Sequence, residues 1–374
     1  AAAAAAAPVF AATSLQQRAE FLELCADEIM ALGDALPERV ALETGYPKAR
    51  GEGERARTVN QLRLFASSIR SGEYLNIRID TALPDRQPLP RPDIRYTNQP
   101  IGPVVVFGAS NFPLAFSVAG GDTAAALAAG CPVIVKGHNS HPGTCELVAR
   151  ALHKAVQKAG LPAGVFSLIM GVGREVGSEL VVAPEVKAVG FTGSLAGGMA
   201  LFQLANNRPE PIPVFAEMGS VNPVVLLPEA LAQNAEGIAA GFVGSLTLGV
   251  GQFCVNPGVA VAIQSPALDR FCAAASAALA KVPAGVMLNE GIAAAYQKGT
   301  AHLSAQSGVE LVGSGEAVGD KAGFCTQAKL FKVTAEAFLA NPHLQEEVFG
   351  HVSVLVSCAD QAQLLAVVRT LKGQ

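Results

Sequence analysis

Apolar side chains recur every three to four positions through residues 12–75, as at Phe21, Leu22 and Ile29. This is the spacing of one face of a helix. The same pattern predicts a second helix around Arg55–Ile69. The first part of the chain is therefore expected to be helical.

The pattern changes after this helical region. Tyr74–Asp80 alternates apolar with polar residues, which is the period of a strand. Residues 84–100 are rich in proline, which suits connectors and exposed strand edges. We expect extended structure and a connector here.

From Pro103 to about Pro228, short apolar runs alternate with helical stretches. The predicted strands are Val104–Phe107, Pro132–Lys136, Val165–Met170, Val186–Phe191 and Ile212–Phe215, with helices at Gly121–Ala129 and Thr144–Ala159. Such alternation predicts a parallel, doubly wound α/β sheet, whose ligands lie beyond the carboxyl ends of the strands. The residues that fall at those ends are Asn111, Lys136, Gly171, Gly193 and Glu217.

A second alternating region follows. Its predicted elements are helix Ala235–Leu248, strand Val259–Ile263, helix Pro266–Ala280, strand Lys329–Val333, strand Val352–Ser357 and helix Gln361–Leu371. The fold class is therefore α/β throughout, and 374 residues are enough for two domains.

Composition narrows the function classes. The net charge is −4 and there is no run of Lys or Arg, so nucleic-acid binding is not expected. Apolar runs are shorter than the roughly 18 residues of a spanning helix, so we expect a soluble protein without a membrane partner. The seven cysteines are widely spaced and odd in number, which favours the reducing cytoplasm over a disulfide framework. The alanines at positions 1–7 lack the charged start of a signal peptide.

His138 and His141 form the only close histidine pair. Neither a carboxylate nor a thiol is neatly paired with them in the sequence, and a closed metal site usually needs four ligands. No metal is therefore predicted.

Cys254 lies in a turn of small residues, flanked by Gly249, Gly251 and Pro257. Such a turn can present a side chain, and a thiolate is a natural nucleophile toward a carbonyl carbon. Most cysteines in an apolar chain are structural, so both interpretations stay open from the residues alone.

Two further polar residues each have a structural and a chemical interpretation. Glu217 could cap the next element, or could be a partly buried base that activates water. Asn111 could form a turn before Phe112-Pro113, or its amide could stabilise an oxyanion, an effect worth about 3 kcal/mol.

Gly193–Gly198 follows a predicted strand and opens a helix, whose N-terminus favours phosphate. It lacks the Gly-Lys-Ser/Thr ending of a P-loop. Gly171–Gly177 also departs from Gly-x-Gly-x-x-Gly, because its last glycine is one place late. Either glycine-rich turn alone is a weak signal.

Taken together, short motifs along the chain resemble those of the aldehyde dehydrogenase superfamily. They are Ser110–Pro113, Val135-Lys136, Phe191–Ser194, Glu217–Gly219, Gly251–Cys254 and Glu346–Gly350. Their order and spacing are similar over roughly residues 15–374. Within the superfamily, Phe107–His153 and Phe191–Gly258 look most like the NADP-dependent α-ketoglutarate-semialdehyde (2,5-dioxovalerate) dehydrogenases. They are nearly as similar to a related NADP-dependent fatty aldehyde dehydrogenase.

The resemblance implies catalytic roles. Cys254 would form a thiohemiacetal with the aldehyde, and its backbone N–H and the Asn111 side chain would hold the oxyanion. Hydride transfer to the nicotinamide would leave a thioester. Glu217 would then activate the water that hydrolyses this thioester to a carboxylate.

Cofactor residues follow in the same way. Lys136 and Glu347 resemble the ribose-binding residues, and Phe349 resembles the residue beside the nicotinamide. The residues that match the turn near the pyrophosphate are Gly193, Ser194 and Gly198.

NADP is the expected cofactor, with NAD possible. NAD-preferring relatives often carry a carboxylate where this chain has the neutral Asn139, three residues after Lys136. Arg174 falls where a related NADP enzyme has a phosphate-binding arginine, and an arginine fork suits phosphate. For a carboxylated semialdehyde, Arg57 is the expected cationic partner, with a solvated surface arginine as its other interpretation.

The resemblance also implies a domain organisation: a Rossmann-type cofactor domain, an α/β catalytic domain and a small oligomerisation arm. The expected segments are 1–72 (N-terminal helices of the cofactor domain), 73–100 (arm), 101–217 (NAD(P)-binding domain) and 218–374 (catalytic domain). A homodimer or tetramer is expected.

The sequence departs from the superfamily in two respects. Other members are longer, so the C-terminal segment is expected to be missing here. His351 stands where proline is usual, which puts the shape of that loop in question. A CoA-acylating enzyme and a non-catalytic homologue are rival interpretations. The Glu217 carboxylate argues against the first, because that subgroup tends to lack it, and the presence together of Cys254, Glu217 and Asn111 argues against the second.

Overall fold

The computed structural model describes residues 1–319 and 323–371, and the side chain of Arg174 also lies outside this description. The chain divides into two compact units, residues 1–218 and 219–374. The division does not test the roles predicted for the segments 1–72, 73–100, 101–217 and 218–374. Those roles remain predictions. Within the described part of the chain, no helix combines the length and apolar character needed to cross a membrane.

The first unit begins with helices. They are α1 (Ala2–Ala11), α2 (Leu15–Met30), α3 (Ala35–Thr44) and α4 (Lys48–Ser71), followed by the short 3-10 turn η1 (Glu73–Leu75). Ser14 caps α2 with a capping box in which Gln17 returns the hydrogen bond. The predicted helical region is confirmed, although the helix of the alanine-rich start was not predicted.

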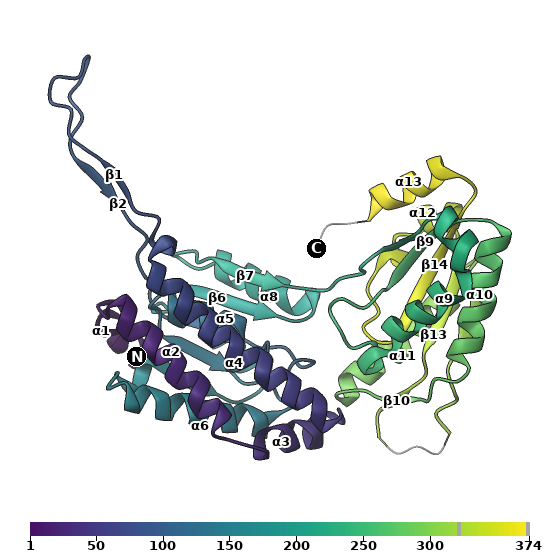
Figure 1. The fold of residues 1–374 in the computed structure, drawn as a ribbon, viewed down its shortest axis with the longest axis horizontal. Coiled ribbons are helices and arrows are strands. Elements are labelled where there is room, and N and C mark those ends of the chain that lie inside the picture. The colour runs from purple at the N-terminus through teal and green to yellow at the C-terminus, as the bar shows by residue number, and fades with distance from the viewer. Residues whose placement is uncertain (320–322, 372–374) are drawn as a thin grey trace. The chain divides into compact units, whose positions relative to one another are not determined.

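A two-stranded ribbon follows, formed by β1 (Arg78–Asp80) and the antiparallel β2 (Ile94–Tyr96). It extends away from the helices of this unit (Figure 1). Every residue of both strands is exposed, including Ile79, Ile94 and Tyr96. The ribbon therefore contributes no core within the described residues.

The sheet of the first unit has the strand order β5-β4-β3-β6-β7, with every pairing parallel. Its strands are β3 (Val104–Phe107), β4 (Val133–Lys136), β5 (Phe166–Ile169), β6 (Ala188–Thr192) and β7 (Val214–Glu217). The helices between them are α5 (Gly121–Ala128), α6 (Pro142–Lys158), α7 (Gly173–Val182) and α8 (Leu195–Asn206), with the 3-10 turn η2 (Ala163–Val165) before β5. The predicted doubly wound sheet is confirmed.

Successive side chains of β3 belong to two different hydrophobic cores, one on each face of the first sheet. Val104 and Val106 pack with α2, α4, α5 and α6 on one face, whereas Val105 and Phe107 pack with α7 and α8 on the other. Successive side chains of a strand point to opposite faces, so a run of apolar residues is buried on both sides. Val104–Phe107 is buried throughout for this reason.

The second unit repeats the α/β principle around the strand order β11-β13-β14-β9-β8. Its elements are β8 (Val224–Leu226), α9 (Pro228–Thr247), η3 (Leu248–Gly251), β9 (Val259–Ile263), α10 (Pro266–Leu279), β10 (Gly285–Val286), α11 (Glu290–Ser304), β11 (Glu310–Ser314), β12 (Cys325–Thr326), β13 (Lys329–Thr334), α12 (Ala335–Ala340), η4 (Pro342–Gln345), β14 (Val352–Cys358) and α13 (Gln361–Thr370). Strands β8, β9, β14 and β13 run parallel, and β11 pairs antiparallel with β13.

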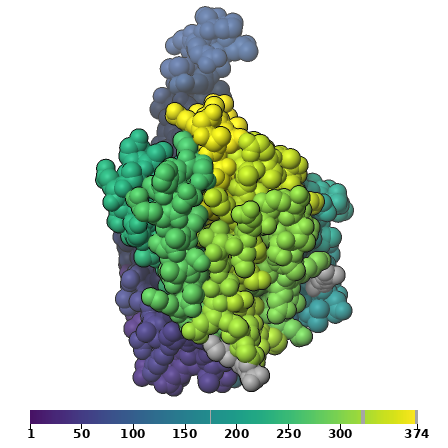
Figure 2. Space-filling view, turned by 90° about the vertical axis from the view of Figure 1, so that its right-hand side faces the viewer, coloured from purple at the N-terminus to yellow at the C-terminus, as the bar shows by residue number. Residues whose placement is uncertain are grey.

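Helices cover both faces of this sheet as well. Ala260 and Ala262 of β9 pack against α9 and α10, whereas Val259 and Val261 belong to the core that α11, α12 and α13 complete. Figure 2 shows one face of this unit, where α9 and α10, in green, lie side by side. The antiparallel edge strand β11 and helix α11 were not predicted, although the buried residues Ala293, Tyr296, Thr300 and Leu303 of α11 recur at helical spacing.

Candidate active site

The carboxyl edge of the first sheet gathers the residues predicted to lie there. β3 leads into the loop with Asn111, β4 ends at Lys136, and β6 is followed by Gly193. Glu217 is the last residue of β7, which ends two residues later than the predicted strand Ile212–Phe215. The strand order reverses direction between β3 and β6, and the crevice at such a point is where doubly wound sheets bind ligands.

The Asn111 loop is fixed by a charged pair on α4. Arg50 Nη2 donates to the Asn111 backbone oxygen at 2.8 Å. Glu54 Oε2 accepts the N–H groups of Leu114 at 3.1 Å and Ala115 at 3.4 Å. Arg50 Nε also pairs with Glu54 Oε1 at 3.4 Å. Burial is the main cause that raises the pKa of Glu54, while the N–H groups and Arg50 oppose it.

Aromatic rings surround the same loop. The Arg50 guanidinium lies 3.9 Å from the centre of the Tyr46 ring and 5.1 Å from that of Phe112. Arg57 is exposed and lies 4.7 Å from the centre of the Phe116 ring and 5.7 Å from that of Phe112. Asn111 itself is buried, so its loop is enclosed by cations and rings. The structure thus brings Arg57 close to the residue after Asn111.

Lys136 lies at the end of β4 with a buried side chain. Its Nζ donates to the Asn139 Oδ1 at 3.1 Å, and Asn139 itself is exposed. Burial lowers the pKa of Lys136 from its usual value. Lys136 and Asn139, both used in the cofactor prediction, are therefore neighbours.

The loop after β4 is tied to the loop after β3 through His141. Its Nε2 lies 3.1 Å from the Ala109 backbone oxygen, and its Nδ1 lies 3.3 Å from the Cys145 sulfur. Glu43 from α3 accepts the N–H groups of Gly143 and Thr144 at 2.7 and 2.8 Å, which caps α6. Burial lowers the pKa of His141. The histidine pair is used in packing, and the described residues include no group of three His, Cys, Asp or Glu side chains that could hold a metal.

The turn after β6 begins helix α8. The Ser194 hydroxyl accepts the Gly197 N–H at 3.2 Å, so this residue is the N-cap. A Cβ on Gly198 would lie 2.5 Å from the Met218 sulfur, so a larger residue there would require the Met218 side chain to move. A helix N-terminus with exposed residues before it can accept a phosphate, and this fits the predicted pyrophosphate turn.

Glu217 and Arg174 are two further predicted site residues of this unit. Glu217 is exposed. The partial burial expected for a water-activating base is therefore not found. Its carboxylate adds to burial in raising the pKa of Asp122, in the first turn of α5. Arg174 is the second residue of α7, and its side chain lies outside the described residues.

In the second unit, Cys254 follows an unusual backbone. Gly249, Val250 and Gly251 have φ values of +56°, +62° and +65°, which is the left-handed region. Valine rarely adopts it, so Val250 is strained by roughly 1–3 kcal/mol. A Cβ on Gly251 would lie 2.4 Å from the backbone of Gly350 and His351. Glycine is required there because the backbone of a second loop packs against it.

The residue before Phe253 anchors this turn. Gln252 is fully buried, and its Oε1 accepts the Leu288 N–H at 2.9 Å. Cys254 is only partly buried, as a reacting thiol requires. The described geometry therefore agrees with a turn that presents the thiol, as its small neighbours predicted.

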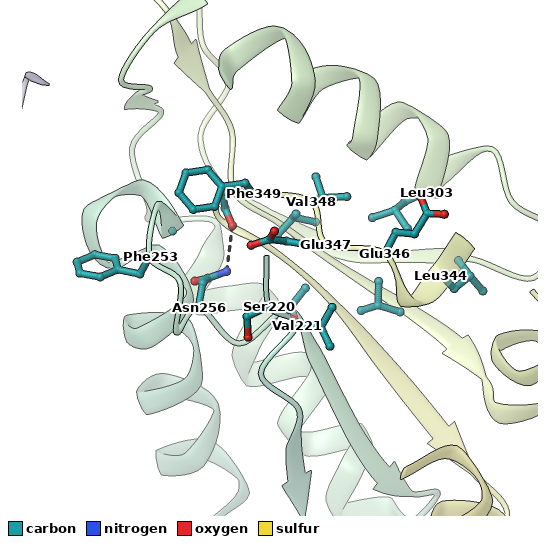
Figure 3. A pocket seen from close by; sticks show the side chains of 16 residues that line it. Ser220, Val221, Phe253, Asn256, Leu303, Leu344, Glu346, Glu347, Val348 and Phe349 are labelled. Atoms are coloured by element: carbon teal, nitrogen blue, oxygen red, sulfur yellow. Dashed lines mark hydrogen bonds between the residues drawn. The ribbon is translucent and has the colours of Figure 1, made fainter. Parts of the chain in front are cut away.

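A pocket lies beside the Cys254 turn, within the second unit. Phe253, Asn256, Ser220, Glu347 and Phe349 line it, with the Glu347 carboxylate between the Phe349 loop and Ser220 (Figure 3). The residue Glu347 is exposed as a whole, yet neighbouring atoms displace water from its carboxylate. This desolvation raises its pKa, and a hydrogen bond with the Ser220 backbone opposes the rise.

His351 replaces the proline usual in the resembling family, and the structure explains how the loop accepts it. The side chain is buried, its Nε2 lies 2.9 Å from the Thr326 hydroxyl, and its ring contacts Tyr296 at 5.3 Å. Burial lowers the pKa of His351 to about 4. The histidine is thus a neutral core residue behind the Gly350 turn.

Sequence reasoning missed Arg50 and Glu54. Their spacing of four residues on a helix was visible, but such pairs usually lie on the solvated face. Only the tertiary structure shows that they reach the Asn111 loop, 61 residues along the chain from Arg50.

Comparison with known proteins identifies the family. The sequence pattern of the aldehyde dehydrogenase family matches residues 1–370. The chain belongs to this family. Aldehyde dehydrogenases oxidise small aldehydes with NAD(P), and many are oligomers. This reaction class agrees with the partly buried Cys254 thiol and with the glycine-rich turn before α8.

Individual aldehyde dehydrogenases are similar over nearly the whole chain. α-Ketoglutaric semialdehyde dehydrogenase 2 of Azospirillum brasilense is 59% identical over 365 residues, which is 98% of this chain and 69% of that protein. The α-ketoglutaric semialdehyde dehydrogenase of Acinetobacter baylyi is 49% identical over 363 residues, covering 97% of this chain and 68% of that protein. The solved structure of 3,6-anhydro-L-galactose dehydrogenase has a TM-score of 0.83 at 24% identity, and the match covers 99% of this chain and 75% of that one. The aldehyde dehydrogenase fold predicted from the motifs is confirmed.

Proposed function

We propose that this aldehyde dehydrogenase oxidises α-ketoglutaric semialdehyde (2,5-dioxovalerate) to the dicarboxylic acid with NADP⁺. The observation that carries the proposal is the identity of 59% to a relative of that name, which extends over 98% of the chain. Side chains near Asn111 and Cys254 supply a chemical rationale for both the reaction and the substrate.

Cys254 is the proposed nucleophile. Its thiolate adds to the aldehyde carbon and gives a thiohemiacetal, whose oxyanion accepts hydrogen bonds from the Asn111 amide and the Cys254 backbone N–H. The chemistry that NADP⁺ supplies when bound is acceptance of a hydride. The thioester left on Cys254 is hydrolysed by water, from which Glu217 removes a proton, and the thiolate is released as the acid forms.

Lys136 and Glu347 are the proposed ribose contacts, and Phe349 would lie beside the nicotinamide. Residues 193–198 would bind the pyrophosphate at the start of α8. The neutral Asn139, already bonded to Lys136, leaves room for a 2′-phosphate without repulsion. We expect Arg174→Ala to lower kcat/KM with NADP⁺ by roughly tenfold or more and to change that with NAD⁺ little. Equal effects on both cofactors would remove this role from Arg174.

Arg57 is the proposed partner of the substrate carboxylate. Its guanidinium is exposed yet held over the rings of Phe112 and Phe116, beside Asn111. Arg57→Ala should raise KM for 2,5-dioxovalerate by about tenfold and leave KM for pentanal unchanged. Arg63→Ala is the matched control, because Arg63 is on the same helix and pairs with Asp27 at the surface. An unchanged KM for the dioxovalerate would remove the role from Arg57.

The main test is NADP⁺ reduction measured with short, long and carboxylated aldehydes, with Cys254→Ala run in parallel. We expect the carboxylated C5 semialdehyde to give the highest kcat/KM and the variant to give no turnover. A preference for long unbranched aldehydes would favour a fatty aldehyde dehydrogenase instead. A requirement for CoA would indicate the acylating reaction, which the proposed water-activating role of Glu217 does not predict.

We also propose that the β1–β2 ribbon joins copies of this chain into a homodimer or tetramer. Its support is the exposure of Ile79, Ile94 and Tyr96 on strands that contribute no core to the described part of their own chain. Light scattering after chromatography tests this, with Ile79→Glu/Ile94→Glu expected to lower the oligomer mass. The cytoplasmic location stays a prediction that rests on the wide spacing and odd number of the seven cysteines.

A further inference from the structure

Turns that precede neighbouring strands of the second sheet meet at its amino edge. Asn222 lies just before β8, Cys254–Asn256 lie before β9, and Gly350 lies before β14. These strands are parallel neighbours in the order β14-β9-β8, so their starts are adjacent. A backbone hydrogen bond also joins the segments that precede β9 and β8, because the Gly258 N–H donates to Val221 O at 2.9 Å.

The Asn222 amide joins the first two turns. Its Nδ2 donates to the backbone oxygens of Cys254 at 2.7 Å and of Asn256 at 3.0 Å. Asn222 has a φ of +43°, a left-handed conformation that asparagine tolerates better than most residues. Its short side chain is thereby held against both carbonyl groups.

The turn itself is closed by a backbone bond. The Asn256 N–H donates to Phe253 O at 3.1 Å. This oxygen belongs to the same peptide plane as the Cys254 N–H, because the peptide unit is rigid. Fixing Phe253 O therefore fixes the direction of the N–H that is proposed to stabilise the oxyanion.

Asn256 joins the nucleophile turn to the third segment. Its Nδ2 donates to Gly350 O at 3.0 Å, as the dashed line in Figure 3 marks. Its Oδ1 is buried and has no hydrogen-bond partner among the described residues. Glu347 and Phe349, the proposed cofactor contacts, lie in the same loop as Gly350, so one amide couples the thiol turn to the cofactor loop.

We propose that Asn222 and Asn256 are positioning residues that lock the Cys254 turn to the loop 347–350. They hold the thiol and the Cys254 N–H in a fixed geometry relative to Glu347 and Phe349. This inference rests on the proposed function only for the role of Cys254. The positioning itself can be measured on the thiol without substrate.

The variant Asn222→Gly tests the amide. Glycine keeps the left-handed backbone free of strain, so only the two hydrogen bonds are lost. We expect kcat to fall by roughly 10- to 100-fold with KM for the aldehyde changed less than about threefold, because misplacing a reacting group affects the chemical step most. The rate and pH profile of Cys254 alkylation by iodoacetamide, followed by mass spectrometry, should shift as well.

Asn256→Ala supplies a second variant, which breaks only the bond to Gly350. Gln327→Glu is the control for stability, because Gln327 also donates through its amide to a carbonyl, Gly315 O at 2.6 Å, but does not line the pocket. Gln327→Glu is expected to lower Tm and to leave the rate of Cys254 alkylation unchanged.

Outcomes separate the two proposals. Parent-like kcat and alkylation in both asparagine variants, with a lowered Tm, would assign the residues a purely structural role and overturn the inference. A shifted alkylation profile in a protein that oxidises no aldehyde would retain the positioning role and reject the proposed function.

Discussion

The Asn111 loop and the Cys254 turn hold their reactive groups in different ways. The Asn111 loop follows the carboxyl end of a strand and is fixed by the partly buried Arg50 and the buried Glu54. The Cys254 turn precedes the amino end of a strand and is fixed by neutral amides and left-handed glycines. The first region depends on charge, whereas the second depends on backbone shape.

The difference has a chemical consequence. Arg50 and Glu54 hold the Asn111 loop through charge-assisted hydrogen bonds to its backbone. Amide donors hold the Cys254 turn without adding a formal charge next to the thiol. Charge removal should therefore loosen the first region, and added side-chain volume should disrupt the second.

The largest effect is expected for Gly251→Ala. The new Cβ would lie 2.4 Å from the backbone of Gly350 and His351, and φ is +65°, so neither loop can relax cheaply. We expect a loss of about 4 kcal/mol or more in the free energy of unfolding of the second unit. Pulse labelling of the buried Cys358 thiol after equilibration in urea measures it.

Gly244→Ala is the matched control for this change. Gly244 is exposed on α9 and a Cβ there would meet nothing within 4 Å. Alanine should stabilise the helix by up to about 1 kcal/mol. If Cys358 were protected from labelling to the same extent in Gly251→Ala and Gly244→Ala, backbone shape would not govern the Cys254 turn.

Glu54→Gln is expected to have the next largest effect. It removes the negative charge that pairs with Arg50 and replaces one of the two accepting carboxylate oxygens, at a cost of about 3 kcal/mol to the first unit. Labelling of the buried Cys25 reports this unit, and Cys254 alkylation should not change. Glu52→Gln, an exposed change on the same helix, should cost less than about 0.5 kcal/mol. A matching loss in both variants would contradict the dependence on charge.

His351 should make the second unit sensitive to acid. Its pKa in the folded state is about 4, below the ordinary 6.5, so the unfolded chain binds the proton more tightly. Stability is then complete above pH 6.5 and falls as pH decreases toward 4, by about 2 kcal/mol between pH 7 and pH 5. Glu54 has the opposite sign, because its raised pKa makes its contribution fall as pH increases.

His351→Gln removes the titrating group while its amide can still bond to the Thr326 hydroxyl. The urea midpoint reported by Cys358 should then change less between pH 7 and pH 5 than in the parent. His302→Gln, at an exposed position, should leave the parent's pH dependence intact. The same acid loss in His351→Gln would assign the sensitivity to other groups.

The smallest effect is expected for Tyr46→Phe. The Tyr46 hydroxyl is buried and has no hydrogen-bond partner among the described residues, while its ring supports the Arg50 guanidinium at 3.9 Å. Phenylalanine keeps the ring and removes the unsatisfied hydroxyl, so stability should stay equal or rise by up to about 1 kcal/mol. A clear loss in the Cys25 midpoint would show that the hydroxyl, and not the ring, supports the charged region.

The sequence by itself determined the elements and the family. Val104–Phe107 and Val259–Ile263 are found with the predicted bounds, because a short apolar run between glycines and prolines is buried on both faces of a sheet. The motifs around Asn111, Glu217 and Cys254 determined the family, because their order and spacing are read along the chain. The carboxyl-edge rule also placed Lys136 and Gly193, since parallel strands end together.

The tertiary structure decided what holds these residues. Nothing local shows that Arg50 and Glu54 reach the Asn111 loop, or that the Asn222 amide donates to two carbonyl oxygens of the Cys254 turn. These bonds join segments 32 to 61 residues apart, and a polar residue in a helix or turn has the same local pattern whether it faces water or a distant loop. Long-range hydrogen bonding carries no period in the sequence, so only the folded chain reveals it.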